Sequence, residues 1–581
     1  MKTQIILILI LFSNIPIALA ATHGVNVMEA PIQNQYSYDG KNVNPGNPEW
    51  GKTHIPLVRM APSDYSDNIK SINEKLPNPR DISNKICSSD NPPKDPKGLS
   101  DINWIWGQFI SHDIAFTPTQ ERNIEQYEAE RLAIQSPGDE KFFTPNSLIM
   151  SIFRSIYDKT TGTDPDNPRE QINVITAWMD GGMIYGSNKE RADWLRTFEN
   201  GQMKTSQHEN GDLLPLADLE TPESKDTRGL EAFIAGDTRS NEHIALMSMH
   251  ILFLREHNRL AEELHENNPE FTDEDLYQTA RAINTAQIQI ITYNEYLPSL
   301  GIELDEYTGY DPSINPSITN EFSVTAFRMG HSQNGKWLLR LDEKRQEISA
   351  GNIEVKDGFF NPTIISQDGG VDPIFRGAAF NIQDKVDTIF DDSVRNFMFG
   401  SPNEGGLDLC AIDIIRARDH GIPNYNTVRE ALGLGKVTDW SDITSDPELQ
   451  SKLKTTYKNV DNIDLIIGTL AEDHFKDSSV GITMHYIIKD QFERIRNGDP
   501  NFYLNDPLLI SYDDIALSQI IKRNTQIEKI QYKIFIAEPD CCAGEIKLNE
   551  IKISSITLFI ILEILIVSLL IFCIIYLPKK K

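Results

Sequence analysis

The 581-residue chain is predicted to be mainly α-helical, with one large domain, minimal β structure and a single C-terminal transmembrane helix. Three observations support this fold class. Apolar residues recur at helical spacing in many segments after residue 100. No internal repeat or clear linker interrupts them before about residue 538. A predominantly apolar stretch near the C-terminus is long enough to span a bilayer. The net charge of −30 argues against a nucleic-acid partner.

Both ends of the chain have features of a protein of the secretory pathway. Residues 1–20 combine a short apolar run with an Ala-x-Ala site, which predicts a cleaved signal peptide. Residues 553–577 predict a transmembrane helix with Glu563 as its only charge, between a juxtamembrane linker (538–552) and a short cytoplasmic tail (578–581). The main domain is then expected on the extracytoplasmic side of a cell-surface or endomembrane. Removal of the tail, as in a GPI signal, is the alternative and would release a secreted protein.

Between these ends the chain divides into an arm and a helical domain. Residues 21–100 are rich in Pro, Asn, Gly and Ser, and we expect an extended arm wrapped on the domain that spans residues 101–537. Five cysteines do not supply a disulfide scaffold and match no zinc motif, so the core is expected to hold itself together.

The first strong helix of the domain lies within residues 104–118. On a helix, Gln108 and His112 share one face, whereas Asp113 is rotated by about 100°. That arrangement suits a pair of residues that serves two sites, although a core helix with a satisfied buried histidine has the same pattern.

Further helices are predicted from apolar periodicity, and the region 336–365 alternates enough for one or two short strands. Ser240 is a candidate cap for the long helix that follows it. The predicted helices cover one segment that ends near Phe198 and residues 247–266, 273–293, 319–330, 385–399, 407–417, 426–434, 447–454, 462–470, 481–497 and 515–524.

Three histidine-bearing segments stand out in the sequence: Gln108 with His112 and Asp113, the segment 235–260, and Thr325-Ala-Phe-Arg-Met-Gly-His331. Together they resemble the animal-type haem peroxidases of the peroxidase–cyclooxygenase superfamily, in particular its peroxinectin-like members. Other blocks that match the family, in the expected order across about residues 40–537, are 169–173, 185–187, 292–298, 406–409, 416–421 and 520–525.

The resemblance implies a haem b cofactor and a peroxide-cleaving site. His331 would be the proximal iron ligand, which leaves the opposite haem face open for H2O2. On that face His112 would act as general acid and base, and Arg239 would stabilise the charge that develops as the O–O bond breaks. Gln108 would hydrogen-bond a distal water or anion.

The resemblance also suggests which side chains hold the haem on its proximal side. Asp413 stands where mammalian members have asparagine, and it would accept a hydrogen bond from His331 and make this ligand more basic. Arg328, Arg416 and Arg418 resemble the arginines that hold haem propionates.

Covalent attachment of the haem is expected to be at most single. Glu242 occupies one position at which family members form an ester with haem. Ser111 replaces the aspartate at the other position, and serine cannot form that ester. His243 replaces the methionine that bonds haem in one mammalian branch.

A calcium ion is the second implied cofactor. Asp113 and Asp180 would supply carboxylates, and Thr176 and the Trp178 carbonyl further oxygens, because hard oxygen ligands suit Ca²⁺. Gly182 stands where the family pattern has serine, so only its backbone could take part.

The function predicted is that of a haem peroxidase that uses H2O2 to oxidise a halide, a pseudohalide or a small phenolic donor. One alternative is a fatty-acid oxygenase on the same fold, but Arg328 occupies the place of the radical tyrosine of cyclooxygenase-type members. The other is a non-enzymatic adhesion protein at the cell surface, although the chain has no Arg-Gly-Asp tripeptide.

Overall fold

The computed structural model of the chain describes residues 30–32, 36–120, 130–142, 148–218, 221 and 232–538. All of them belong to one compact unit that ends at Glu538. The predicted signal peptide, transmembrane helix and cytoplasmic tail lie outside the described residues, as does nearly all of the predicted linker. Within the part that is described, no helix is long and apolar enough to cross a membrane.

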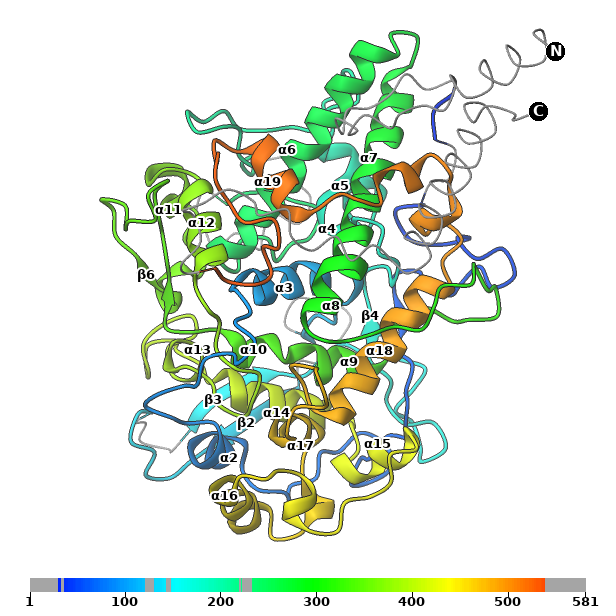
Figure 1. Cartoon of the computed structure of the whole chain (residues 1–581). Coiled ribbons are helices and arrows are strands. Elements are labelled where there is room, and N and C mark those ends of the chain that lie inside the picture. Colours follow the sequence, from blue (N-terminus) through cyan, green and yellow to red (C-terminus); the bar gives the residue numbers. More distant parts are fainter. Residues whose placement is uncertain are drawn as a thin grey trace, which may run out of the picture. The chain divides into compact units, whose positions relative to one another are not determined.

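Three helices build the centre of the domain (Figure 1). The long helices α6 (Ile244–Asn267) and α7 (Asp273–Ile291) pack against each other, and α3 (Ile102–Ile114) packs against α6. Their side chains are largely buried, and α7 starts at a capping box in which Thr272 and Asp275 satisfy each other's backbone amides. The prediction of a mainly helical domain with a helix around His112 is confirmed.

Shorter helices surround this centre. They are α2 (Pro79–Ile86), α4 (Gly182–Tyr185), α5 (Lys189–Leu195), α8 (Leu297–Ser299), α9 (Asn320–Val324), α10 (Gly330–Gln333), α11 (Thr363–Gln367), α12 (Asp372–Phe380), α13 (Asp392–Arg395), α14 (Leu409–Asp419), α15 (Tyr425–Ala431), α16 (Pro447–Tyr457), α17 (Leu465–Ala471), α18 (Ile482–Asn497) and α19 (Leu517–Asn524). Helices predicted from residue 407 onward are confirmed within a few residues at each end.

The sheet content of the described residues is three antiparallel strand pairs. The pairs are β1 (Ile55–Pro56) with β4 (Ile172–Asn173), β2 (Arg131–Gln135) with β3 (Leu148–Phe153), and β5 (Trp337–Leu338) with β6 (Ile353–Glu354). The last pair confirms the strands expected in 336–365. The β2–β3 hairpin was missed, and it buries Ile134 and Met150 in a small cluster with Ala411 and Ile415 of α14.

Two predicted helices are wrong in detail. The segment 319–330 is divided into α9, a 3-10 turn and α10, so His331 lies on a short separate helix. The segment 385–399 is helical only at α13. Asp387 accepts a hydrogen bond from the amide of Ile389, and Asp391 caps α13 through the amide of Ser393. Such local bonds compete with a continuous helix.

The start of α6 also differs from the prediction. Its N-cap is His243, whose Nδ1 accepts a hydrogen bond from the amide of Ala245 at 3.2 Å, and not Ser240. The periodic pattern located the helix, but an N-cap histidine is outside the usual set of capping residues.

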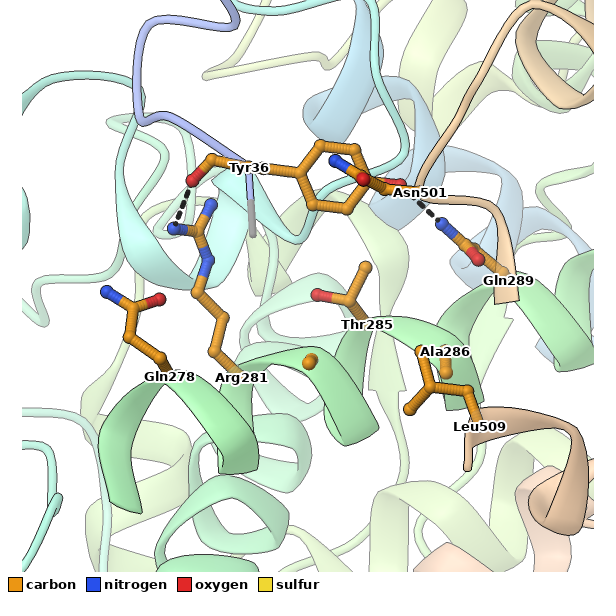
Figure 2. Close-up of a pocket in the computed structure, with 9 residues that line it drawn as sticks. Tyr36, Gln278, Arg281, Thr285, Ala286, Gln289, Asn501 and Leu509 are labelled. Atoms are coloured by element: carbon orange, nitrogen blue, oxygen red, sulfur yellow. Dashed lines mark hydrogen bonds between the residues drawn. The ribbon is translucent and has the colours of Figure 1, made fainter. Parts of the chain in front are cut away.

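The N-terminal arm is mostly irregular and packs on the helices, except where it forms α2. Gly40 and Gly51 both have φ of +69°, and a Cβ on either would lie within 3 Å of Trp178. Tyr36 lies over α7, where its carbonyl accepts from Arg281 and its hydroxyl accepts from Gln289 (Figure 2). The close approach of glycines and the anchored tyrosine hold the arm on the domain.

A disulfide joins Cys87, at the end of α2, to Cys410, in the first turn of α14. The sequence does not predict this bond, and a single cross-link is still no disulfide scaffold. The two cysteines are 323 residues apart, and such a separation gives no sign in the sequence that they meet.

Candidate active site

Gln108 and His112 converge on one carboxylate. They lie one helical turn apart on α3, and both approach Glu242, in the loop before α6. The Gln108 amide donates to Glu242 Oε2 at 3.1 Å, and His112 Nε2 lies 3.7 Å from the same oxygen. The predicted distal residues and the predicted ester-forming glutamate therefore meet at one place.

Arg239 is held by Asp237 in a side-on ion pair. Its Nε and Nη2 lie 2.9 Å and 2.8 Å from Oδ1 and Oδ2 of this carboxylate. Its Nη1 donates to the Ala115 carbonyl at 3.2 Å, and its guanidinium lies 4.1 Å from the centre of the Phe116 ring. These contacts fix the cation at the C-terminal end of α3, close to His112.

Asp237 is a residue of the site that was not predicted. Its Oδ1 lies 3.7 Å from His112 Nδ1, a buried nitrogen without a hydrogen-bond partner in the described part of the chain. The signal that could have found it is the carboxylate two residues before the candidate arginine, in Gly236-Asp-Thr-Arg239.

Burial and neighbouring charges set the ionisation of this group of residues. Burial lowers the pKa of His112 well below its usual value, and the Arg239 cation lowers it further. Burial alone would raise the pKa of Asp237, but Arg239 and then His112 hold it well below its usual range. The site at neutral pH therefore combines a neutral imidazole with an ionised carboxylate and a guanidinium.

The second histidine has a carboxylate partner as well. His331 Nδ1 lies 2.6 Å from Asp413 Oδ2, and Arg328 Nη1 donates to Asp413 Oδ1 at 2.7 Å. Asp413 is buried on α14, whereas 31% of the His331 side chain is exposed. With Nδ1 held by Asp413, Nε2 is the nitrogen that can bind a metal.

Arg416 and Arg418, also on α14, form ion pairs inside the protein. Arg416 Nη1 donates to Asp419 Oδ2 at 3.0 Å, and also to Ser155 and the Phe153 carbonyl. Arg418 forms a side-on pair with Asp464, with two distances of 2.7 Å. Of the three candidate propionate arginines, Arg328 is the one placed beside His331.

These residues fit a haem. His112 Nε2 lies beside Glu242, the predicted haem-linked carboxylate, and the side chain of His331 is 31% exposed with its Nδ1 held by Asp413. The helix α10 that carries His331 packs against α3, which carries His112. A histidine held by a carboxylate is a common axial ligand of haem iron.

His243 and Ser111, which are predicted to form no covalent bond with haem, have other partners. His243 is occupied as the cap of α6, and its Nε2 lies 3.1 Å from the Val355 carbonyl. Ser111 lies one residue before His112 and continues the helix, since its carbonyl accepts from the Ala115 amide.

The predicted calcium ligands lie close together on the other side of α3. Thr176 donates to Asp180 Oδ2 at 3.1 Å and lies 3.4 Å from the Trp178 carbonyl. Asp113 accepts from the amide of Met183 at 3.3 Å, and a Cβ added to Gly182 would lie 3.0 Å from Asp180 Oδ1 and 3.5 Å from Asp113 Oδ1. These contacts link the five predicted residues to one another.

The chemistry of this group suits a cation. Burial, and then the charge of Asp180, raise the pKa of Asp113 well above its usual value, and burial raises that of Asp180 to about 6 even though Arg281 lowers it. Two buried carboxylates repel each other, and a divalent ion would remove that cost. Across the residues described, no cluster of three or more His, Cys, Asp or Glu side chains could hold a metal. The proposed set has two carboxylates and draws its other oxygens from a hydroxyl and the backbone.

The fold and the match to a family model define the class of protein. The chain belongs to the animal haem peroxidase family, whose model matches residues 35–535. It is a peroxidase, an oxidoreductase that acts on peroxide with the help of an electron donor.

Particular relatives support this assignment. The chain is similar to Peroxinectin A of Dictyostelium discoideum, with 36% identity over 86% of this chain and 95% of that protein. The structure of Peroxidase A from the same organism matches with a TM-score of 0.81 and 35% identity, over 87% of this chain and 100% of that one. A fatty acid alpha-dioxygenase of Oryza sativa shares the fold, with a TM-score of 0.71 and 19% identity over 90% of each chain.

Proposed function

We propose that the peroxidase reaction uses His331 as the iron ligand and His112, Arg239 and Gln108 on the opposite side of a haem b. The observation that carries the proposal is the packing of α10, which carries His331, against α3, which carries His112. Asp413 supports this assignment because it leaves only Nε2 of His331 for iron.

The protein residues would act on peroxide in a fixed order. When bound, haem supplies the iron centre that reduces peroxide and then oxidises the donor. Neutral His112 would take a proton from H2O2 and return it to the departing oxygen, which leaves as water. Arg239 stabilises the negative charge on that oxygen during cleavage. Gln108 donates its amide to a water or an anion beside the reacting oxygens.

The test is peroxide turnover by the purified holoenzyme with bromide, thiocyanate and guaiacol as donors. We expect at least one of them to be oxidised. His112→Ala is expected to slow the reaction with H2O2 by about 10² to 10⁴-fold, the usual contribution of a general acid–base residue. Turnover by this variant at the wild-type rate would contradict the assignment, as would a protein that binds no haem.

Fatty-acid oxygenation is the less favoured reaction. Arg328, at the place of the radical tyrosine of cyclooxygenase-type members, is bound to Asp413 and provides no phenol. Oxygen uptake with a polyunsaturated fatty acid would distinguish the two reactions, and we expect none.

A single ester through Glu242 would attach the haem. This carboxylate lies beside Gln108 and His112, on the predicted distal face. We expect part of the haem of the wild-type protein to resist acid–acetone extraction, and all of it to be released from Glu242→Gln. Complete extraction from the wild type would contradict the link.

Calcium would occupy the group formed by Asp113, Thr176, Trp178, Asp180 and Gly182. Because Asp113 lies on α3 next to His112, the bound ion would hold this helix in place. We expect about one calcium ion per chain by elemental analysis, and a lower melting temperature after chelation that added Ca²⁺ restores. Asp113→Asn should lose both the ion and this effect. A calcium-free protein whose melting temperature does not respond to chelation would contradict the site.

The main domain would lie outside the cytosol, held by the apolar segment 553–577 after removal of residues 1–20. The amino-acid pattern of these two segments supports the proposal. Protease protection of tags at the two ends of residues 553–577 tests the topology, and release of the protein by alkaline carbonate would contradict a spanning anchor.

A further inference from the structure

Asp237 links the two side chains proposed to act on peroxide. Its carboxylate accepts two hydrogen bonds from the guanidinium of Arg239 and one from the backbone amide of Arg239. Oδ1 of Asp237 also lies 3.7 Å from His112 Nδ1. We infer that Asp237 is a positioning residue that holds both Arg239 and His112 in the geometry needed for peroxide cleavage. The inference rests on the proposed function, which assigns roles to His112 and Arg239 and none to Asp237.

The carboxylate orients Arg239 in a defined way. A side-on pair fixes the plane of the guanidinium as well as its position. Asp237 occupies Nε and Nη2, and the Ala115 carbonyl occupies Nη1. The cation is therefore held at the end of α3, beside His112, without reorganisation when charge develops on the departing oxygen.

The same carboxylate favours one proton arrangement on His112. A neutral imidazole carries its proton on one nitrogen, and an ionised carboxylate favours the nitrogen that faces it. Asp237 faces Nδ1, so the lone pair remains on Nε2, toward Gln108 and Glu242. Glu242 lies equally far from Nε2, but 31% of its side chain is exposed against 2% for Asp237, so solvent screens its charge more.

The backbone around Asp237 is held by contacts with the segment that contains Gly182 and Met183. Its amide donates to the Met183 carbonyl at 3.0 Å, and the Met183 amide donates to Asp113. A Cβ on Gly236 would lie 2.3 Å from the Gly182 carbonyl oxygen, so the two loops touch through their backbones. Through this contact, the backbone at Asp237 packs directly against the segment that carries the proposed calcium ligands.

The experiment compares three variants of the haem-loaded protein by stopped-flow absorbance. The measured quantity is the second-order rate constant of the Soret change after mixing with H2O2, per haem. Asp237→Asn keeps the shape of the side chain but not its charge. Asp139→Asn is the matched control, because Asp139 forms a buried side-on pair with Arg80 outside the site. His112→Ala reports on the proposed function.

We expect Asp237→Asn to slow the reaction with peroxide by about 10- to 100-fold, the effect of misplaced catalytic groups, and Asp139→Asn to stay within about twofold of wild type. Cyanide binding to the ferric enzyme should slow similarly, because HCN also gives its proton to the distal base. The rate constant for oxidation of the donor should not change, which separates positioning from general damage.

A rate for Asp237→Asn within twofold of wild type, with His112→Ala slow, would overturn the inference and leave the proposed function intact. Wild-type rates in both variants would overturn the proposed function. If Asp237→Asn does not bind haem, Asp237→Glu replaces it, because it keeps the charge but moves the carboxylate by one methylene. The same slow reaction is then expected, and a wild-type rate would overturn the inference.

Discussion

Asp413 shares its two carboxylate oxygens between two residues of the candidate site. One accepts from His331 at 2.6 Å, and the other from Arg328 at 2.7 Å. An anionic partner raises the electron donation of a histidine ligand to iron, more than a neutral amide does. The residue at this single position therefore tunes the proposed iron centre without touching the iron.

Replacement of this carboxylate should change the potential of the iron. In Asp413→Asn we expect the Fe(III)/Fe(II) potential to rise by tens of millivolts, since about 59 mV corresponds to a tenfold change in the relative stability of ferric iron. Spectroelectrochemical titration measures it. Asp408→Asn is the control, because Asp408 caps the same helix and does not contact His331. An unchanged potential in Asp413→Asn would refute the effect.

Gly236 packs too closely against a neighbouring loop for any side chain to be accommodated there. A Cβ there would lie within 2.6 Å of backbone atoms of residues 182, 184 and 186, none of which can turn aside like a side chain. We expect Gly236→Ala to destabilise the protein by about 1 to 3 kcal/mol. Gly46→Ala is the control, because its Cβ would meet only Asn44 Oδ1, at 3.4 Å. Equal denaturant midpoints for the two variants would contradict this account.

At the scale of elements, the arm is fastened to the helices through Tyr36. Its hydroxyl donates to Asp499 Oδ2 at 2.5 Å, just beyond the end of α18, and accepts from Gln289 of α7. Figure 2 shows the tyrosine lying across α7 at this point. One half-buried side chain therefore joins three segments that are distant in sequence.

This junction should make stability depend on pH. Burial raises the pKa of Asp499 to about 7, although the hydrogen bond from Tyr36 lowers it. An unfolded aspartate titrates near 3.9, so between about pH 4 and 7 the folded state binds more protons and its stability falls as pH rises. Asp499→Asn cannot ionise, so the wild type should lose about 1 to 4 kcal/mol relative to it across this range.

Urea unfolding at pH 5 and pH 8 measures this difference. Tyr36→Phe removes the hydrogen bond that lowers the pKa of Asp499, so this pKa should be higher in the variant. The free energy of unfolding of Tyr36→Phe should therefore continue to fall to a higher pH than that of the wild type. If the difference in free energy of unfolding between wild type and Asp499→Asn stays constant from pH 5 to pH 8, Asp499 is ionised throughout that range and the prediction is wrong.

At the scale of the whole molecule, a disulfide closes a long stretch of the chain. Cys87 and Cys410 join α2 to α14, which carries Asp413. Closing such a long loop restricts the unfolded chain, and removal of a native disulfide typically costs about 2 to 5 kcal/mol. The bond thus ties the N-terminal arm to α14, the helix whose Asp413 contacts His331.

We expect Cys87→Ala to lower the free energy of unfolding by about 2 to 4 kcal/mol. The double variant with Cys410→Ala should lose little more, because the bond is already absent after the first change. Calorimetry of the three proteins, with thiol titration of the wild type, tests this. A further loss of stability in the double variant, or five free thiols in the denatured wild type instead of at most three, would contradict the cross-link.

The family and the main residues of the site could be predicted from short segments of sequence. His112 and Asp113 were assigned to different sites because neighbours on a helix point in different directions. The predicted helices were confirmed where apolar periodicity was strong, as in α6, α7 and α18. They failed near residues 385–391, where side chains that bond their own backbone interrupt the helix.

The sequence by itself determined the helical class, the family and the residues proposed to carry its chemistry, because these depend on local patterns and on the order of motifs. Only the tertiary structure decided their partners. It placed Asp237 between Arg239 and His112, gave Arg416 an internal ion pair, and joined Cys87 to Cys410. Such contacts depend on packing between segments that are far apart in the chain, and spacing along the sequence does not record that packing.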